Sequence, residues 1–189
     1  RAALGYLFFP VLGVLVNSGI VSVKDAEIKE MLDVLSKTNE FKTAGEKIAK
    51  KIGNRIPIVY ASEMLSAVAY RWKTQFNENS KSAAFYHVFS EMNHNEIAAY
   101  ETMEKNKFIA IFLRDKEDNE RVRKRMDITK EIISSKIDFE EVFTKGEFLL
   151  SRMFSGIYFG DFASYYLALS NRIDPTPVTV IENLKKKLK

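Results

Sequence analysis

Four short runs rich in β-branched and aromatic residues alternate with segments of helical periodicity, and this alternation constrains the fold more than any other feature of the chain. The runs lie at residues 55–62 (RIPIVYAS), 83–89 (AAFYHVF), 107–115 (KFIAIFLRD) and 137–145 (IDFEEVFTK). Helical patterns fill the segments between them, at 63–76, 95–101 and 117–135. Strands that alternate with helices form a parallel sheet covered on both faces. The sequence therefore predicts an α/β fold, a three-layer sandwich with a parallel sheet flanked by helices.

Additional helices are expected before the first strand. Residues 4–17 are almost entirely apolar, which predicts a buried helix. Residues 24–51 show two successive helical phases, and the pair Gly53-Asn54 is expected to stop the second.

Further helices are expected after the last strand. Residues 146–172 are apolar almost all round, which predicts a long and heavily buried helix. The DPTP sequence at 174–177 breaks this pattern, because proline disfavours helix at the preceding residue. A basic helix over 178–189 closes the chain.

The composition excludes several classes of protein. The chain has no cysteine, which rules out disulfides and cysteine–metal sites and predicts a cytoplasmic protein. The longest apolar run, ALGYLFFPVLGVLV, is too short for a membrane span and is interrupted by Pro10 and two glycines, so no membrane partner is expected.

The net charge is +4, and much of the excess lies in RVRKR (121–125) and KKKLK (185–189). Such runs are typical of solvated helix faces. A nucleic-acid-binding protein would need groove-reading or aromatic partners beside them, and none is arranged in that way. We therefore expect no nucleic-acid partner.

One polar stretch stands out, RWKTQFNENSKSAAFYHVFSEMNHNEI at residues 71–97. It contains both histidines of the chain, four asparagines and three glutamates. Glu78 lies between Asn77 and Asn79 and is either a helix-terminal acid or a general base. His94 lies between Asn93 and Asn95 and is either a polar residue near a helix N-terminus or a proton shuttle.

The same stretch raises the question of a metal site, since His87, Glu91, His94 and Glu96 are close in sequence. No H-E-x-x-H spacing exists, and His87 falls on a predicted strand, where a structural role is expected. Phosphate-binding glycine motifs are also absent. Ser62, in YASEML, offers only a weak anion-site geometry.

Ligands of parallel sheets bind beyond the carboxyl ends of the strands. The polar clusters at 77–82 and 90–95 are expected to be loops at that edge, close to one another. The residues by themselves indicate an α/β domain that binds a sugar or a phosphate, with possible acid–base chemistry.

Three segments carry a more specific resemblance: NRIPIVYASEMLSAVAYRWKTQFNENSK, FYHVFSEMNHNEI and DPTPVTVIENLKKKL. Together they resemble the carboxyl-terminal half of the bifunctional phosphoglucose/phosphomannose isomerases, whose sugar-isomerase domains are flavodoxin-like. The opening RAALGYLFFPVL resembles the stretch that links the two halves in that family. Ser90 departs from the proline expected before the glutamate of the second motif.

The resemblance implies a role for each of four residues. Glu78 matches the base that moves a proton between C1 and C2, and His94 matches a residue that helps to open the sugar ring across a dimer interface. Arg1 matches an arginine that stabilises the enediolate, and Lys185 matches a lysine that assists ring opening, with its register open because Lys186 and Lys187 adjoin it. A carboxylate, an arginine, a histidine and a lysine supply the chemistry of aldose–ketose isomerisation, so neither a metal nor another cofactor is expected.

The implied substrates are glucose 6-phosphate, mannose 6-phosphate and fructose 6-phosphate, and the implied assembly is a homodimer with a shared active site. Residues 1–22 would form a linker helix from a missing N-terminal sugar-isomerase domain, and residues 23–189 the C-terminal one. In the family the phosphate-binding serine/threonine loop lies in the N-terminal half, so this chain alone is expected to have little activity. The alternative is a non-catalytic, regulatory module of the same fold that binds a sugar phosphate.

Overall fold

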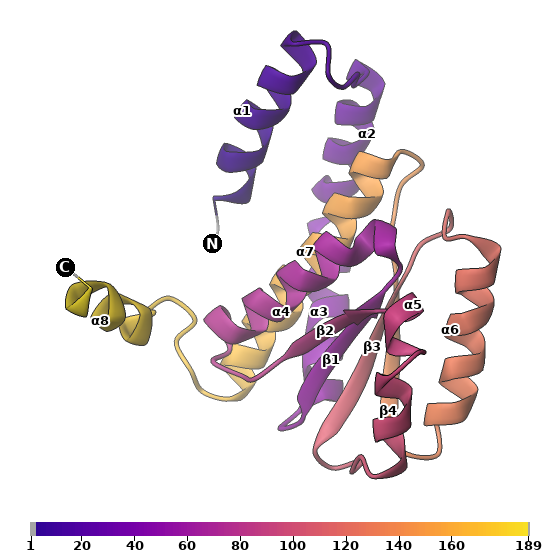
Figure 1. Cartoon of the computed structure of the whole chain (residues 1–189). Coiled ribbons are helices and arrows are strands. Elements are labelled where there is room, and N and C mark those ends of the chain that lie inside the picture. The colour runs from indigo at the N-terminus through magenta and orange to yellow at the C-terminus, as the bar shows by residue number, and fades with distance from the viewer. Residues whose placement is uncertain (1–2, 189) are drawn as a thin grey trace.

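A four-stranded parallel sheet forms the centre of the structure, a computed structural model that describes residues 3–188 (Figure 1). The strands lie in the order β2-β1-β3-β4, and every neighbouring pair is parallel. Their bounds are β1 Ile56–Ala61, β2 Phe85–Val88, β3 Phe108–Arg114 and β4 Asp138–Phe143. The predicted parallel sheet and the four predicted strand positions are confirmed.

Helices cover both faces of this sheet, which confirms the three-layer prediction (Figure 1). One face carries α2 (Asp25–Ser36), α3 (Thr38–Ile52), α4 (Ser66–Asn79) and α7 (Leu149–Ser170), with the short η1 (Glu63–Leu65) before α4. The opposite face carries α5 (Phe89–Met92), η2 (Glu96–Glu101) and α6 (Glu120–Ile133).

Alternation along the strands supplies a separate core to each face. Val59 and Ala61 of β1 contribute to the core beneath α3, α4 and α7. Ile58 and Tyr60 of the same strand contribute to the core beneath α5, η2 and α6. Successive side chains of a strand point to opposite faces, so both faces of β1 are buried and its sequence is apolar throughout.

The long helix α7 is buried almost all round, as its sequence predicts. Ten of its residues are buried, because it lies between α3 and α4 on one face of the sheet. The indole nitrogen of Trp72 on α4 donates a 2.7 Å hydrogen bond to the carbonyl oxygen of Gly156 on α7. Such close approach of two helices requires small residues at the contact. Gly156 and Gly160 of α7 lie there, against Val68 and Trp72 of α4.

The first helix, α1 (Leu4–Asn17), forms where predicted, but the expectation that it is buried is wrong. None of its residues is buried, and Tyr6 is 87% exposed. It touches the rest of the structure through Phe8 and Phe9, whose rings pack on Phe154 of α7. Apolarity on every side of a helix indicates burial only if neighbours exist on every side, and within this chain α1 has them on one side.

The terminal helix α8 (Thr179–Lys187) also extends away from the sheet, and none of its described residues is buried (Figure 1). Between residues 3 and 188, no helix combines the length and the hydropathy that a bilayer span requires.

Glycine at position 45 is needed for α3 to pack on α7. A methyl group there would lie 2.5 Å from Cβ of Phe162 and 2.8 Å from its carbonyl carbon, so backbone would have to move. We expect Gly45→Ala to lower the free energy of unfolding by about 2 kcal/mol, the range of overpacked cores. Urea unfolding of the two proteins measures the difference.

Gly13 of α1 is the matched control, because a methyl group there would meet no atom within 4 Å. Gly13→Ala should leave stability unchanged or raise it slightly, since alanine favours helix. Equal effects of the two substitutions would contradict the close packing of α3 on α7.

Candidate functional site

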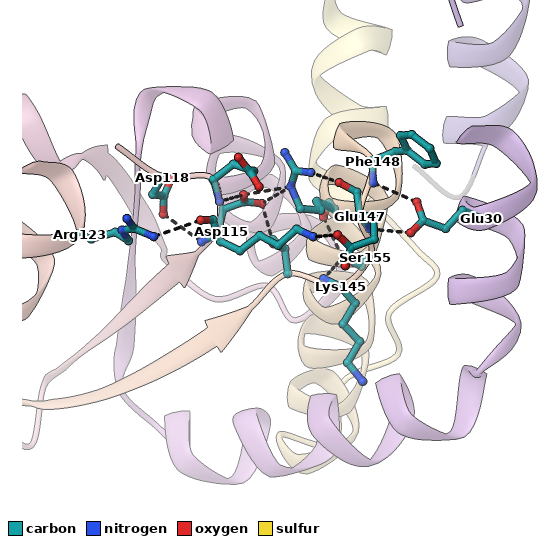
Figure 2. A network of polar contacts seen from close by, with 12 residues as sticks. Glu30, Asp115, Asp118, Arg123, Lys145, Glu147, Phe148 and Ser155 are labelled. Carbon is teal, nitrogen blue, oxygen red and sulfur yellow. Dashed lines mark hydrogen bonds and ion pairs between the residues drawn. The ribbon is translucent and has the colours of Figure 1, made fainter. Parts of the chain in front are cut away.

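The carboxyl ends of β3 and β4 are occupied by a network of the chain's own polar groups (Figure 2). Asp115, which follows β3, accepts two 3.0 Å hydrogen bonds from Nε of Arg152 on α7 and one of 2.6 Å from the hydroxyl of Thr144. Asp115 and Arg152 are both buried. These charges satisfy one another and tie the start of α7 to the strand ends, which favours a structural role for this edge.

Glu30 extends the same network to α2 (Figure 2). Its carboxylate accepts hydrogen bonds from the backbone N–H groups of Glu147 and Phe148, at 2.6 and 3.0 Å, and from the hydroxyl of Ser151 at 2.7 Å. The two N–H groups belong to the residues just before α7, which begins at Leu149, and a negative charge near the start of a helix is favourable. Glu30 thereby fastens α2 to α7.

Glu78 lies in the last turn of α4, beside the amino end of β2. Helix α4 starts beyond the carboxyl end of β1 and has to return to the amino edge before β2 can begin in parallel (Figure 1). Its 14 residues cover about 20 Å on this return. The expectation that residues 77–82 reach the carboxyl edge is therefore wrong.

A cavity of about 510 Å³ opens next to Glu78. It is bounded by the end of α4, the connection after α7 and the first turn of α8, and its lining comprises Asn77, Glu78, Lys81, Ile173, Asp174, Pro177, Val178, Thr179, Val180 and Ile181. The Lys81 ammonium group donates to the carbonyl oxygens of Glu78 (2.7 Å) and Pro175 (3.2 Å) and so joins two walls. The structure thus places the proposed base in a concave site of ligand size.

The two asparagines that flank Glu78 fix the end of α4. The amide nitrogen of Asn77 donates to the carbonyl oxygen of Ser82 at 2.9 Å, and that of Asn79 donates to the hydroxyl of Ser164 at 2.8 Å. These bonds hold the last turn of α4 against the following loop and against α7.

His94 lies after β2 and α5, at the carboxyl edge, and its side chain is exposed. Asn95 caps η2 by accepting a 2.5 Å hydrogen bond from the N–H group of Glu96. Ser90, at the position where the family resemblance predicts proline, donates a 2.7 Å hydrogen bond to Glu63. Within one chain, Glu78 therefore lies at the amino edge of the sheet and His94 at the carboxyl edge.

The remaining predicted residues are spread over the structure. Arg1 lies outside the described residues. Lys185 is exposed in the last turn of α8, beyond the part of that helix that lines the cavity. His87 lies on β2 and its Nδ1 accepts a 3.0 Å hydrogen bond from the N–H group of Val88. Between residues 3 and 188, no group of three or more His, Asp or Glu side chains is arranged to hold a metal.

Sequence reasoning missed two polar groups, the partly buried Asp161 and a pair of buried tyrosines. Asp161 on α7 accepts hydrogen bonds from Gln75 (2.8 Å) and Arg71 (3.2 Å), and burial raises its pKa although both partners oppose the rise. Tyr60 and Tyr100 are buried on the other face of the sheet and share a hydrogen bond. The available signal was a polar atom inside an apolar run, as at Tyr60 in IPIVYA.

Comparison with known proteins assigns the fold to a family. Residues 41–188 match the family described as "Bacterial phospho-glucose isomerase C-terminal SIS domain". The chain belongs to this family. The resemblance carried by the three sequence motifs is thereby confirmed, and with it the assignment to a sugar-isomerase (SIS) domain.

Four of the relatives found match the chain along its whole length. Bifunctional phosphoglucose/phosphomannose isomerases from Caldicellulosiruptor bescii and Thermoplasma acidophilum are 42% and 38% identical to it. Each comparison covers 100% of this chain and 59% of the relative, so the chain spans about three fifths of the length of these proteins.

Among solved structures, a glucose-6-phosphate isomerase-like protein from Thermus thermophilus has a TM-score of 0.68 with this SIS domain. It shares 17% sequence identity, and the match covers 92% of this chain and 59% of that one. At this identity the likeness shows the shared SIS fold.

The bond network of Glu30 makes stability depend on pH. Burial opposes ionisation of Glu30, but the hydrogen bonds from Glu147, Phe148 and Ser151 outweigh it and hold its pKa below the ordinary 4.5. Because its pKa is lower in the folded than in the unfolded state, the ionised Glu30 carboxylate stabilises the fold at pH values above its unfolded pKa. This stabilisation is lost as the pH falls through its folded pKa. We expect Glu30→Gln to lower the free energy of unfolding by about 1 kcal/mol at pH 7, as for a lost helix cap.

The difference in free energy of unfolding between the parent and Glu30→Gln should shrink as pH falls below about 4.5, because the parent then loses the same charge. Urea unfolding at several pH values measures it. Asp33→Asn, which removes a charge from an exposed site on the same helix, should show no such pH-dependent deficit. A deficit that stays constant down to pH 3 would contradict this role of Glu30.

Proposed function

We propose that this chain is the C-terminal part of an aldose–ketose isomerase. The enzyme interconverts glucose 6-phosphate or mannose 6-phosphate with fructose 6-phosphate through an enediolate, without a metal. The names of the relatives from Caldicellulosiruptor bescii and Thermoplasma acidophilum support this assignment. The observation that carries it is the position of Glu78, a carboxylate beside a cavity of about 510 Å³ at the end of a rigid helix.

In the proposed reaction, the Glu78 carboxylate takes the proton from C2 of the open-chain aldose. The electron pair of that C–H bond forms the C1–C2 double bond, and the carbonyl oxygen on C1 becomes an oxyanion. A proton passes from the C2 hydroxyl to the oxyanion on C1, which becomes the C1 hydroxyl. The electron pair of the C1–C2 double bond then takes the proton back from Glu78 to form the new C1–H bond, and the oxyanion on C2 becomes the ketose carbonyl. Arg1 is proposed to stabilise the oxyanion, because a cation beside developing negative charge lowers the barrier.

Opening the sugar ring is a separate step that needs a proton donor and acceptor. We assign it to His94 and to Lys185, whose helix α8 forms one wall of the Glu78 cavity. Imidazole exchanges protons readily near neutral pH.

A homodimer with a shared active site explains how Glu78 and His94 can cooperate. Each lies at a different edge of the sheet, so one chain cannot bring them together without unfolding. Exposed apolar side chains on α1 and α8, such as Leu7 and Val180, are consistent with further association. Symmetric dimers are the commonest assembly of soluble proteins.

We further propose that residues 1–22 link this domain to an N-terminal SIS domain that supplies the phosphate-binding loop, with residues 23–189 forming the C-terminal domain. The isolated chain would then turn over little substrate in spite of carrying most of the catalytic side chains. The complete enzyme is proposed to act in the cytoplasm.

Replacing Glu78 tests the proposed chemistry. We expect Glu78→Gln in the full-length protein to lower kcat for fructose 6-phosphate formation by about 10³-fold, because glutamine cannot accept the C2 proton. Substrate affinity should change little, since glutamine keeps the size of the side chain. A coupled isomerase assay and calorimetric titration with fructose 6-phosphate give the two quantities.

The alternative, a non-catalytic regulatory module that binds a sugar phosphate, makes the opposite forecast for this experiment. It expects binding by both proteins and no turnover by either. Lys73→Gln on the same helix serves as a control for loss of charge, and it should retain full turnover. Equal turnover by the parent and Glu78→Gln would rule out Glu78 as the base.

Mixing two inactive variants tests the shared site. In a heterodimer of Glu78→Gln with His94→Asn, one of the two sites would receive both native residues. Random reassortment should therefore restore about a quarter of the parent activity. Activity is measured after mixing and refolding the two proteins. A mixture no more active than its parents would show that Glu78 and His94 do not act across a dimer interface.

A further inference from the structure

Two tyrosine side chains are buried in the apolar core between the sheet and α5, η2 and α6. Tyr60 of β1 is fully buried and Tyr100 of η2 is 2% exposed. Tyr60 packs against the rings of Phe89 and Phe112, with centroids 5.9 Å away in each case. Phenylalanine would fill the same space, and a buried hydroxyl costs free energy unless it is hydrogen-bonded. Each of the two hydroxyls therefore needs a hydrogen-bond partner within the core.

Their hydroxyls form an ordered chain that ends on a carboxylate. Tyr100 donates to the Tyr60 hydroxyl oxygen at 2.6 Å, and Tyr60 donates to Oε1 of Glu96 at 2.5 Å. Burial, followed by the neighbouring Tyr100 and Glu96, raises the pKa of Tyr60, and burial also raises the pKa of Tyr100. Both phenols thus stay protonated, and an ionised carboxylate can only accept. The direction of every bond is fixed.

Glu96 lies two residues after His94, and the residue before His94 is also anchored. The amide nitrogen of Asn93 donates a 2.8 Å hydrogen bond to the hydroxyl of Thr129 on α6, which is 1% exposed. The N–H group of His94 itself donates to the carbonyl oxygen of Glu91 at 2.9 Å. The segment is held to the interior on both sides of His94, while His94 itself is exposed.

We propose that Tyr60 is a positioning residue for His94. Through Glu96 it fixes residues 93–96 relative to β1, an inner strand of the sheet, so that the imidazole is presented outward in one orientation to the sugar in the neighbouring subunit's site. This proposal rests on the function proposed above, in which His94 opens the ring. Side chains that act on a substrate need such support from rigid elements, because small displacements cost much of the rate.

The proposal forecasts a selective loss of one step. If Tyr60 acts through His94, its removal slows ring opening and leaves the proton transfer by Glu78 intact. A substrate that cannot form a ring should then be unaffected. The ketose 5-deoxyfructose 6-phosphate is such a substrate, since it lacks the hydroxyl that closes the furanose ring and its phosphate blocks the pyranose.

The test compares Tyr60→Phe with the parent, both as full-length proteins. Exchange of a C1 proton of each ketose with deuterium from the solvent is followed by NMR, which reports the proton transfer without a coupling enzyme. We expect exchange into fructose 6-phosphate to fall at least about tenfold, a fraction of what acid–base catalysis contributes. Exchange into 5-deoxyfructose 6-phosphate should stay within about twofold of the parent.

Three further variants separate positioning from general destabilisation. Tyr100→Phe removes a hydroxyl from the same core but leaves the bond between Tyr60 and Glu96, so it should keep the parent ratio of the two rates. Glu96→Gln retains an oxygen that can accept the hydrogen bond from Tyr60, so it should also keep the parent ratio of the two rates. Glu96→Ala leaves both phenols in the core and should reproduce the selective loss, which keeps the proposal testable if Tyr60→Phe does not fold.

The outcomes are distinct. Equal losses for the two ketoses, or an unchanged ratio in folded Tyr60→Phe and Glu96→Ala, would overturn the positioning role. A parent protein that exchanges the acyclic ketose but not fructose 6-phosphate would overturn the assignment of ring opening to His94. A parent that exchanges neither sugar would overturn the proposed isomerase function, and the positioning role with it.

Discussion

Parallel pairing of β1 with β2 and with β3 is the constraint on which the rest of this structure depends. Each strand begins at the same edge, so the chain has to return across a face of the sheet after every strand. Helix α4 makes that return after β1, and it ends beside the amino end of β2. The direction of the strands thereby decides where the end of every covering helix lies.

This geometry separates the two side chains on which the proposed chemistry relies. Glu78 belongs to the end of a returning helix, whereas His94 belongs to the segment that leaves β2 at the opposite edge. The buried Asp115 and Arg152 occupy the carboxyl ends of β3 and β4 with a network that is satisfied within the chain. The proposed site therefore lies at a cavity lined by the end of α4 and the start of α8, and not at the carboxyl edge, where ligands of parallel sheets usually bind.

Hydrogen bonds hold the chain on either side of two of the proposed catalytic groups, Glu78 and His94. The amides of Asn77 and Asn79 hold the last turn of α4. On the other side of the sheet, Tyr60 and Thr129 anchor the segment around His94. Two of these bonds join residues distant in sequence, Asn79 with Ser164 and Tyr60 with Glu96, which are 85 and 36 positions apart. A local sequence pattern cannot show which residues will be such partners.

The sequence by itself determined the four strands, the buried α7, the stop of α3 at Gly53 and the family, because strand runs, helical periodicity, turn residues and motifs are local patterns. Only the tertiary structure decided that α1 has neighbours on one side and that Glu78 and His94 lie apart. Burial and proximity depend on which elements pack together. The apolar sequence of α1 does not show which surface it contacts. The separation of 16 positions from Glu78 to His94 does not show in which direction the chain runs.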